Sequence, residues 1–187
     1  MIEISGDIWD FLGRAVIAIT TNGLVTKNGS AVFGRGCASQ ARQRFPDLAL
    51  RLGKLLQEHG NHVHSLGDGL VSFPVEESPW AMPDLHLIRS SAAELRALSD
   101  RQGWERIVVP RPGCGGGGLD WREVRPLLEE FFDYRFYVIS EGRSLSDLGN
   151  RSERMANRGQ ISVNLKTNSG PIRRKFPGIW TDFPFSQ

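Results

Sequence analysis

The apolar positions in the first half of the chain predict strands and helices in alternation. Isoleucines at positions 2, 4 and 8 indicate a first strand, and the run 15–19 is apolar enough to be a central strand. A polar loop with several glycines follows at 22–36. The apolar spacing over 37–45 predicts a helix, and the leucines of 48–56 predict a second helix that closes at Gly60.

The second half of the chain continues this alternation. Residues 62–74 predict a β-hairpin that turns at the Gly67-Asp68-Gly69 sequence. Asp84 has the chemistry of a helix N-cap, and the apolar spacing after it predicts a helix that reaches Leu98. An apolar strand at 107–109 comes next.

The last predicted helix and strand complete the fold class. Asp120 and Glu123 have capping-box spacing, and the helix beyond them carries an apolar stripe that extends to Phe132, with Pro126 inside it. Residues 134–139 predict a final strand. Strands interleaved with helices predict an α/β fold in the form of a three-layer α/β/α sandwich.

Composition agrees with a globular protein. The chain has 187 residues, of which 40% are hydrophobic and 24% charged. No run approaches the roughly 18 apolar residues of a membrane span, and the N-terminus lacks the basic and apolar regions of a signal peptide. Two cysteines do not make a disulfide framework. We therefore expect a cytoplasmic protein that does not engage membranes.

Charge and composition change near residue 140. Residues 1–140 contain 15 Lys/Arg and 17 Asp/Glu, whereas residues 141–187 contain 8 and 4. The later segment is also richer in Asn, Ser and Arg. We expect a folded domain over 1–140 and a basic C-terminal extension over 141–187, whose aromatic end could dock on the domain or on a partner.

A glycine-rich segment separates the strand at 107–109 from the helix that follows Asp120. Five of the six residues 113–118 are glycine. Such a run lets bare backbone approach a ligand, and backbone N–H groups at a strand-to-helix turn attract phosphate. A flexible linker would have polar neighbours rather than an apolar strand, so the sequence favours a phosphate cradle.

A second loop repeats this chemistry. Gly34-Arg35-Gly36 leads into the helix that begins at Cys37. Ligands of open α/β sheets bind beyond the carboxyl ends of the strands, so we expect both loops at one rim. Asp7 and Asn22, which follow the first two strands, belong to the same rim. Two glycine turns there suit a diphosphate held from both sides.

Four motifs follow one another along the chain: Gly6-Asp7-Ile8, Thr20-Thr21-Asn22, Phe33-Gly34-Arg35-Gly36-Cys37-Ala38 and Pro112-Gly113-Cys114-Gly115-Gly116-Gly117-Gly118-Leu119-Asp120-Trp121. The ordered set resembles the macrodomains, which bind ADP-ribose, and covers about residues 1–140. The last motif and Ser72-Phe73-Pro74 are most similar to the branch that includes DNA ADP-ribosyl glycohydrolase antitoxins and ADP-ribosyl-glutamate hydrolases. The resemblance implies a macrodomain-like sandwich with a mixed central sheet.

The resemblance also implies roles for individual residues. Asp7 would accept a hydrogen bond from the adenine amino group, the Ile8 backbone would pair with the ring, and Asn22 would hold the distal ribose. A carboxylate beside the adenine amino group, and backbone amides beside the phosphate oxygens, are the charge-assisted contacts expected for this ligand. ADP-ribose would be the ligand, and no cofactor or metal is implied. The diphosphate would be lined by Gly34, Arg35, Gly36 and Cys37 on one side and by Gly113, Cys114, Gly115, Gly116, Gly117, Gly118 and Leu119 on the other.

Two departures from these branches bear on catalysis. The DNA-acting branch has a lysine where this chain has Glu76, and the glutamate-acting branch has a catalytic aspartate where this chain has Gly117. Asn22 and Asp120 remain as candidate catalytic residues, although the capping-box spacing of Asp120 favours a structural role. We therefore predict recognition of ADP-ribose, free or attached to a protein or nucleic acid, with weak hydrolysis at most.

Two other functions fit parts of the sequence. Gly113, Gly115 and Gly118 satisfy the G-x-G-x-x-G fingerprint of NAD(P)-dependent oxidoreductases, with Glu141 as the acidic partner. The basic extension could instead bind nucleic-acid phosphates. The three histidines between positions 59 and 64 lack a Cys or carboxylate at ligand spacing, so we expect no metal site.

Overall fold

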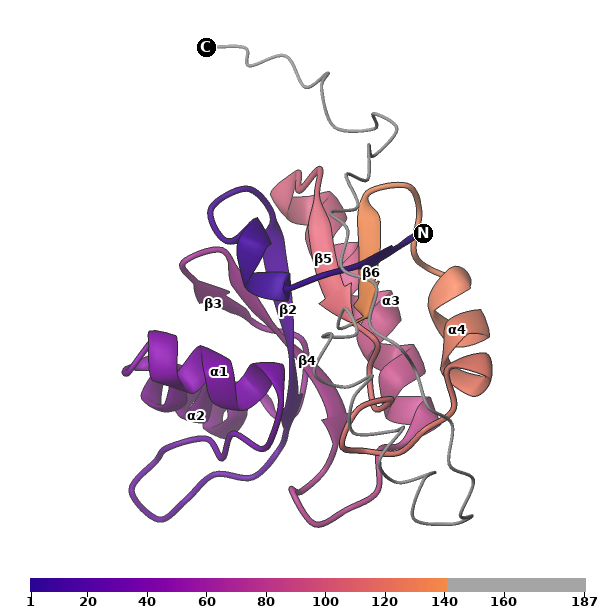
Figure 1. Ribbon diagram of the computed structural model, residues 1–187. Helices are drawn as coiled ribbons and strands as arrows, with labels where there is room; N and C mark the ends of the chain where they lie inside the picture. The colour runs from indigo at the N-terminus through magenta and orange to yellow at the C-terminus, as the bar shows by residue number, and fades with distance from the viewer. Residues whose placement is uncertain (141–187) are drawn as a thin grey trace, which may run out of the picture. The chain divides into compact units, whose positions relative to one another are not determined.

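A computed structural model describes residues 1–140 of the chain (Figure 1). Strands and helices alternate along this part, as the apolar pattern predicts. The elements are β1 (Ile2–Ser5), the 3₁₀ turn η1 (Ile8–Phe11), β2 (Val16–Asn22), α1 (Cys37–Arg44), α2 (Leu48–His59), β3 (Ser65–Gly67), β4 (Leu70–Glu76), α3 (Leu85–Gln102), β5 (Ile107–Pro110), α4 (Trp121–Glu129) and β6 (Phe136–Ser140).

The strands form one mixed sheet in the order β1-β6-β5-β2-β4-β3. Every neighbouring pair is parallel except β3 and β4, which form the predicted hairpin. The carboxyl ends of β1, β2, β4, β5 and β6 therefore meet at one edge of the sheet. We call this edge the carboxyl rim.

Helices cover both faces of the sheet, with α1 and α2 on one side and α3 and α4 on the other (Figure 1). Two apolar clusters follow from this layering. One packs Ile17 and Ile19 of β2 against Leu48 and Leu52 of α2. The other packs β4 and β5 against α3 and α4 and is centred on residues such as Phe73. The predicted three-layer sandwich is confirmed.

The helix ends also follow the predicted signals. The Asp84 carboxylate accepts a hydrogen bond from the His86 N–H at 2.7 Å and caps α3. Gly60 ends α2 with a φ of 82°, which favours glycine. One prediction is wrong: Ile8 does not extend the first strand, because the Asp7 side chain caps a 3₁₀ turn by accepting from the Trp9 N–H.

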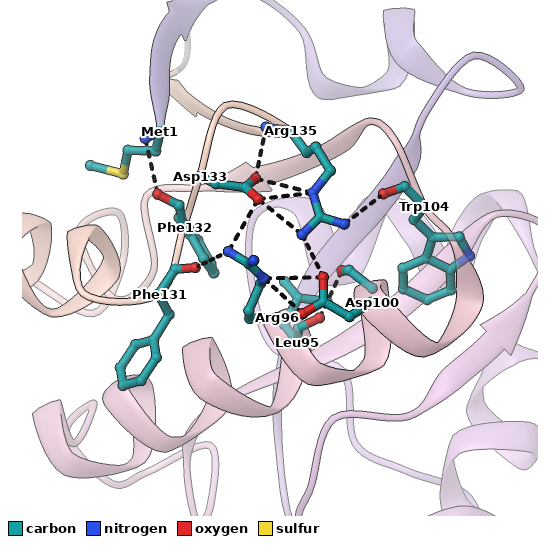
Figure 2. A network of polar contacts seen from close by, with 10 residues as sticks. Met1, Leu95, Arg96, Asp100, Trp104, Phe131, Phe132, Asp133 and Arg135 are labelled. Atoms are coloured by element: carbon teal, nitrogen blue, oxygen red, sulfur yellow. Dashed lines mark hydrogen bonds and ion pairs between the residues drawn. The ribbon is translucent and has the colours of Figure 1, made fainter.

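An ion-pair network holds the edge opposite the carboxyl rim. Figure 2 shows Arg96 and Arg135 between the carboxylates of Asp100 and Asp133. The Nη2 of Arg135 lies 2.5 Å from Asp100 Oδ1 and 2.9 Å from Asp133 Oδ2. Hydrogen bonds from Arg135 and Arg96 lower the pKa of Asp100. The network joins the end of α3 to the segment before β6, so it stabilises the sheet far from the rim.

The remaining expectations concern membranes and the end of the chain. Among the helices of residues 1–140, none combines the length and the apolar character needed to cross a membrane. The basic extension, its aromatic end and the fingerprint residue Glu141 lie outside the described residues.

Candidate functional site

The carboxyl rim brings together the polar residues that follow the strands. Asp7 lies two residues past Ser5, which is in register with Ser140 of β6. Asn22 ends β2 and is the register partner of Glu76 at the end of β4. The glycine-rich segment 113–118, which we call the glycine loop, begins shortly after the end of β5. The predicted site residues therefore share one edge.

The loop that leads into α1 presents unused backbone donors. The N-cap of α1 is Gly36, with a φ of 60°, and no side chain caps this helix end. The N–H groups of Gly34, Arg35 and Gly36 make no hydrogen bond to any residue of 1–140. An uncapped helix start carries a partial positive charge, so this loop is built to receive an anion.

The glycine loop also presents backbone N–H groups that have no acceptor. Two short turns fold it, in which the Gly118 N–H donates to Gly115 O at 3.2 Å and the Leu119 N–H donates to Gly113 O at 3.0 Å. The N–H groups of residues 115–117 make no hydrogen bond within residues 1–140. Three consecutive amides without an internal acceptor can donate to phosphate oxygens.

Arg35 connects the two loops. Its Nη2 donates a hydrogen bond to the carbonyl oxygen of Gly116 at 3.1 Å. The guanidinium also lies against the bare Cα of Gly116, since a Cβ there would be 3.0 Å from Arg35 Nε. The two loops are therefore in contact through the cationic side chain of Arg35. Such an arrangement suits a diphosphate better than a neutral ligand.

The loop between β4 and α3 closes a further side of the site. A Cβ at position 117 would lie 2.5 Å from Pro83 Cγ, so this loop packs directly beneath the glycine loop. Asn61 holds the loop's other end, donating from Nδ2 to Glu76 O at 3.3 Å and to Glu77 Oε2 at 3.2 Å. Sequence reasoning missed Asn61 and Pro83, because neither has a local signal.

Asn22 is buried, with 2% of its surface exposed. Its Nδ2 donates to Val32 O at 3.0 Å, and its Oδ1 accepts from the Leu24 N–H at 3.0 Å. The side chain therefore braces the loop that carries Gly34 to Gly36. The second N–H of the amide has no partner among these hydrogen bonds, since an asparagine amide has two.

Asp120 is the N-cap of α4, and its carboxylate accepts a hydrogen bond from the Arg122 N–H at 2.9 Å. This confirms the structural role that its spacing predicts. The Asp120 carboxylate therefore already offsets the partial positive charge at the start of α4. The glycine loop must attract an anion through its own amides, not through the helix that follows it.

Two ionisable groups of the rim have shifted pKa values. Burial raises the pKa of the Glu76 carboxyl, and the positive charge of Arg35 partly opposes that shift. Burial also raises the pKa of the Cys114 thiol, whose Sγ lies 3.4 Å from Pro112 O. A nucleophilic cysteine needs a lowered pKa, so Cys114 fills the loop rather than reacting.

A cluster outside the rim supports the glycine loop from behind. The carboxylate of Glu3 forms an ion pair with Arg111 at 2.8 Å and accepts a hydrogen bond from Trp121 Nε1 at 3.1 Å. The Arg111 guanidinium stacks over the Trp121 ring at 4.7 Å. These contacts fix both ends of the glycine loop to β1, so the free amides are held in place before a ligand arrives.

Solved structures share the fold of residues 1–140. The macrodomain of DarG from Mycobacterium tuberculosis aligns with a TM-score of 0.60 and 24% identity over 76% of this chain and 97% of that one. The chain has the macrodomain fold. A second match is DarTG of Thermosipho africanus in complex with ADP-ribose, with a TM-score of 0.59, 21% identity, and coverage of 79% of this chain and 44% of that chain.

Two further comparisons complete this picture. The macrodomain of Thermus aquaticus DarG aligns with a TM-score of 0.57 and 21% identity over 76% of this chain and 97% of that one. A DNA ADP-ribosyl transferase–DNA ADP-ribosyl glycohydrolase fusion protein of Thermosipho africanus is 27% identical over 56% of this chain. The match spans 33% of that relative's length. No protein-family model matches the sequence.

The strand order bears on one of the other functions that the sequence left open. The G-x-G-x-x-G fingerprint belongs to a doubly wound sheet, whose strand order differs from the order observed here. The fingerprint therefore lacks the structural context that the dinucleotide-binding oxidoreductase hypothesis requires. Within residues 1–140, no group of three or more His, Cys, Asp or Glu side chains could hold a metal ion.

Proposed function

We propose that this protein recognises ADP-ribose, free or attached to a target, at the carboxyl rim. The observation that carries the proposal is the pair of free-amide surfaces, Gly34 to Gly36 and Gly115 to Gly117, joined by Arg35. Six unpaired backbone donors beside one guanidinium match the charge of a diphosphate. The fold shared with DarTG in complex with ADP-ribose supports this choice of ligand.

The two ends of the ligand would be read by the residues that flank the diphosphate. Asp7 keeps one carboxylate oxygen free, because only Oδ1 accepts from the Trp9 N–H. That oxygen can accept from the adenine amino group while the Ile8 backbone pairs with the ring. At the other end, the remaining N–H of Asn22 can donate to a hydroxyl of the distal ribose.

Catalysis is the weaker half of the proposal. Asp120 is engaged as a helix cap, and Glu76 stands where the DNA-acting branch has a lysine. A Cβ at position 117 would collide with Pro83 and Gly113, so this backbone has no room for an aspartate there. We propose binding with slow hydrolysis at most, on ADP-ribosylated DNA bases or on glutamate esters.

Calorimetry with ADP-ribose, NAD, AMP and ADP tests the proposal. We expect ADP-ribose to bind with micromolar affinity or better, about −8 kcal/mol. AMP should bind much more weakly because it lacks the second phosphate. NAD should bind more weakly than ADP-ribose, because its nicotinamide extends beyond the ribose that Asn22 holds. Equal affinity for NAD and ADP-ribose would contradict the proposed orientation.

A further inference from the structure

The loop between β4 and α3, residues 77–83, exposes two large apolar side chains beside the candidate site. Trp80 is 83% exposed and Met82 is 73% exposed. No other large hydrophobic side chain of residues 1–140 is as exposed as Trp80. An isolated apolar residue on a surface needs no explanation, but an exposed tryptophan beside a binding site is a typical recognition residue.

The loop holds these side chains in a fixed frame. The Asp84 N–H donates to Val75 O at 2.8 Å and closes the neck of the loop, and the Ala81 N–H donates to Ser78 O at 3.0 Å in a turn around Trp80. Pro83 is buried beneath the glycine loop. A preformed loop loses little conformational entropy when a partner binds.

The position of the loop connects it to whatever is attached to the ligand. Asn61 joins the start of the loop to Gly23, since a Cβ at Gly23 would lie 3.0 Å from Asn61 Cγ. Gly23 follows Asn22, the residue proposed to hold the distal ribose. Figure 1 places the loop at the lower end of the view, beside the glycine loop. A target attached to the distal ribose would leave the site past Trp80.

The charge of this segment selects among possible targets. Residues 76–84 contain three carboxylates, Glu76, Glu77 and Asp84, and no lysine or arginine. Glu77 and Asp84 form no salt bridge with any residue of 1–140. Carboxylates on the segment that carries an exposed indole attract a lysine or arginine side chain, whose charge also interacts with the ring face. The same carboxylates repel nucleic-acid phosphates.

We propose that the loop 77–83 docks a basic polypeptide segment that flanks an ADP-ribosylated residue, with Trp80 as the contact for a lysine or arginine side chain. The inference rests on the proposed recognition of ADP-ribose. It extends that function by naming the class of target, which is a basic protein segment rather than a nucleic acid.

Affinity measurements with matched probes test this inference. The probes are free ADP-ribose, three peptides that carry ADP-ribose through a non-hydrolysable linkage, and an oligothymidylate that carries it on one base. The peptides differ only in flanking residues, which are basic, neutral or acidic. We expect the basic peptide to bind about fivefold or more tightly than the neutral one, and the acidic peptide to bind more weakly. The gain should shrink as salt is added.

Three variants assign the effect to the loop. Trp80→Ala should remove most of the gain for the basic peptide and leave the affinity for free ADP-ribose unchanged. Glu77→Gln removes the charge but keeps an acceptor for the Asn61 amide, so it should reduce the gain and its salt dependence. Tyr134→Ala is the matched control, because Tyr134 is 77% exposed but lies before β6, at the edge opposite the rim. This control should leave all five affinities unchanged.

Two results would overturn the inference while leaving the proposed function intact. One is equal binding of the three peptides by a protein that binds free ADP-ribose. The other is preferred binding of the oligothymidylate with loss of that preference in Trp80→Ala, which would make the loop a platform for nucleobases. Failure to bind free ADP-ribose would overturn the proposed function and this inference with it.

Discussion

Gly117 offers a sharp test of how the glycine loop and the β4–α3 loop fit together. A Cβ at this position would lie 2.5 Å from Pro83 Cγ and 2.6 Å from Gly113 O. Both distances are shorter than carbon contacts in folded proteins allow, so Gly117→Ala must displace the glycine loop or Pro83. Overpacking of this kind typically destabilises a protein by about 1–3 kcal/mol.

The same backbone provides the matched control. A Cβ at Gly115 would have no atom within 4 Å, so Gly115→Ala should leave the fold unchanged or slightly more stable. For a chain of this size, about 1–3 kcal/mol corresponds to a Tm lower by roughly 2–10 °C. We expect that loss in Gly117→Ala and little change in Gly115→Ala, measured by thermal unfolding.

Calorimetry on the same variants connects the packing to the function. Gly117→Ala should weaken ADP-ribose binding, because a displaced loop no longer holds its three free amides together. Gly117→Asp, which restores the aspartate of the glutamate-acting branch, should be at least as unstable and should not gain turnover. The reasoning would be refuted if Gly117→Ala matched the wild-type protein in both Tm and affinity.

Three further predictions concern single side chains. Asp7→Ala should weaken ADP-ribose binding by about 1.5–3 kcal/mol in calorimetry while Tm changes little, because a charge-assisted hydrogen bond is lost. Asp120→Ala should lower the stability by about 0.5–2 kcal/mol through loss of the α4 cap, without abolishing any slow hydrolysis. Burial raises the pKa of the Glu76 carboxyl from its ordinary value of 4.5, because the folded state disfavours the ionised form. The folded protein is therefore most stable with respect to this group below pH 4.5, and it loses that stability as the pH rises through the raised pKa. Glu76→Gln should therefore gain Tm relative to the wild-type protein between pH 4 and pH 7.

The local signals in the sequence predicted most of the architecture. Asp84 and Asp120 cap the helices that their spacing indicated, and Gly60 ends α2. These features depend on neighbouring residues, which a sequence displays directly. The apolar pattern places Ile8 in the first strand, because an apolar residue three positions past Ser5 still fits the alternation of Ile2 and Ile4. The backbone hydrogen bonds of the 3₁₀ turn, and the bond that the Asp7 carboxylate accepts from the Trp9 N–H, distinguish it from a strand.

The sequence predicts the individual loops of the site but not the contacts that join them. The order of the glycine motifs indicated both loops, and the parallel sheet brings them to one rim. The contact of Arg35 with Gly116 and the packing of Pro83 against Gly117 join residues far apart in the sequence. Asn61 is an asparagine between a helix and a strand, with no feature to mark it as a support for the rim.

The central claim is that two sets of backbone amides hold the diphosphate of ADP-ribose. Amide chemical shifts of the isotopically labelled protein, recorded while ADP-ribose is added, test it residue by residue. We predict the largest changes at the N–H groups of Gly34 to Gly36 and Gly115 to Gly117, with smaller changes near Asp7. The claim would be contradicted if the chemical shifts of these six amides did not change at a saturating concentration of ADP-ribose. It would also be contradicted if the largest changes occurred at the opposite edge of the sheet.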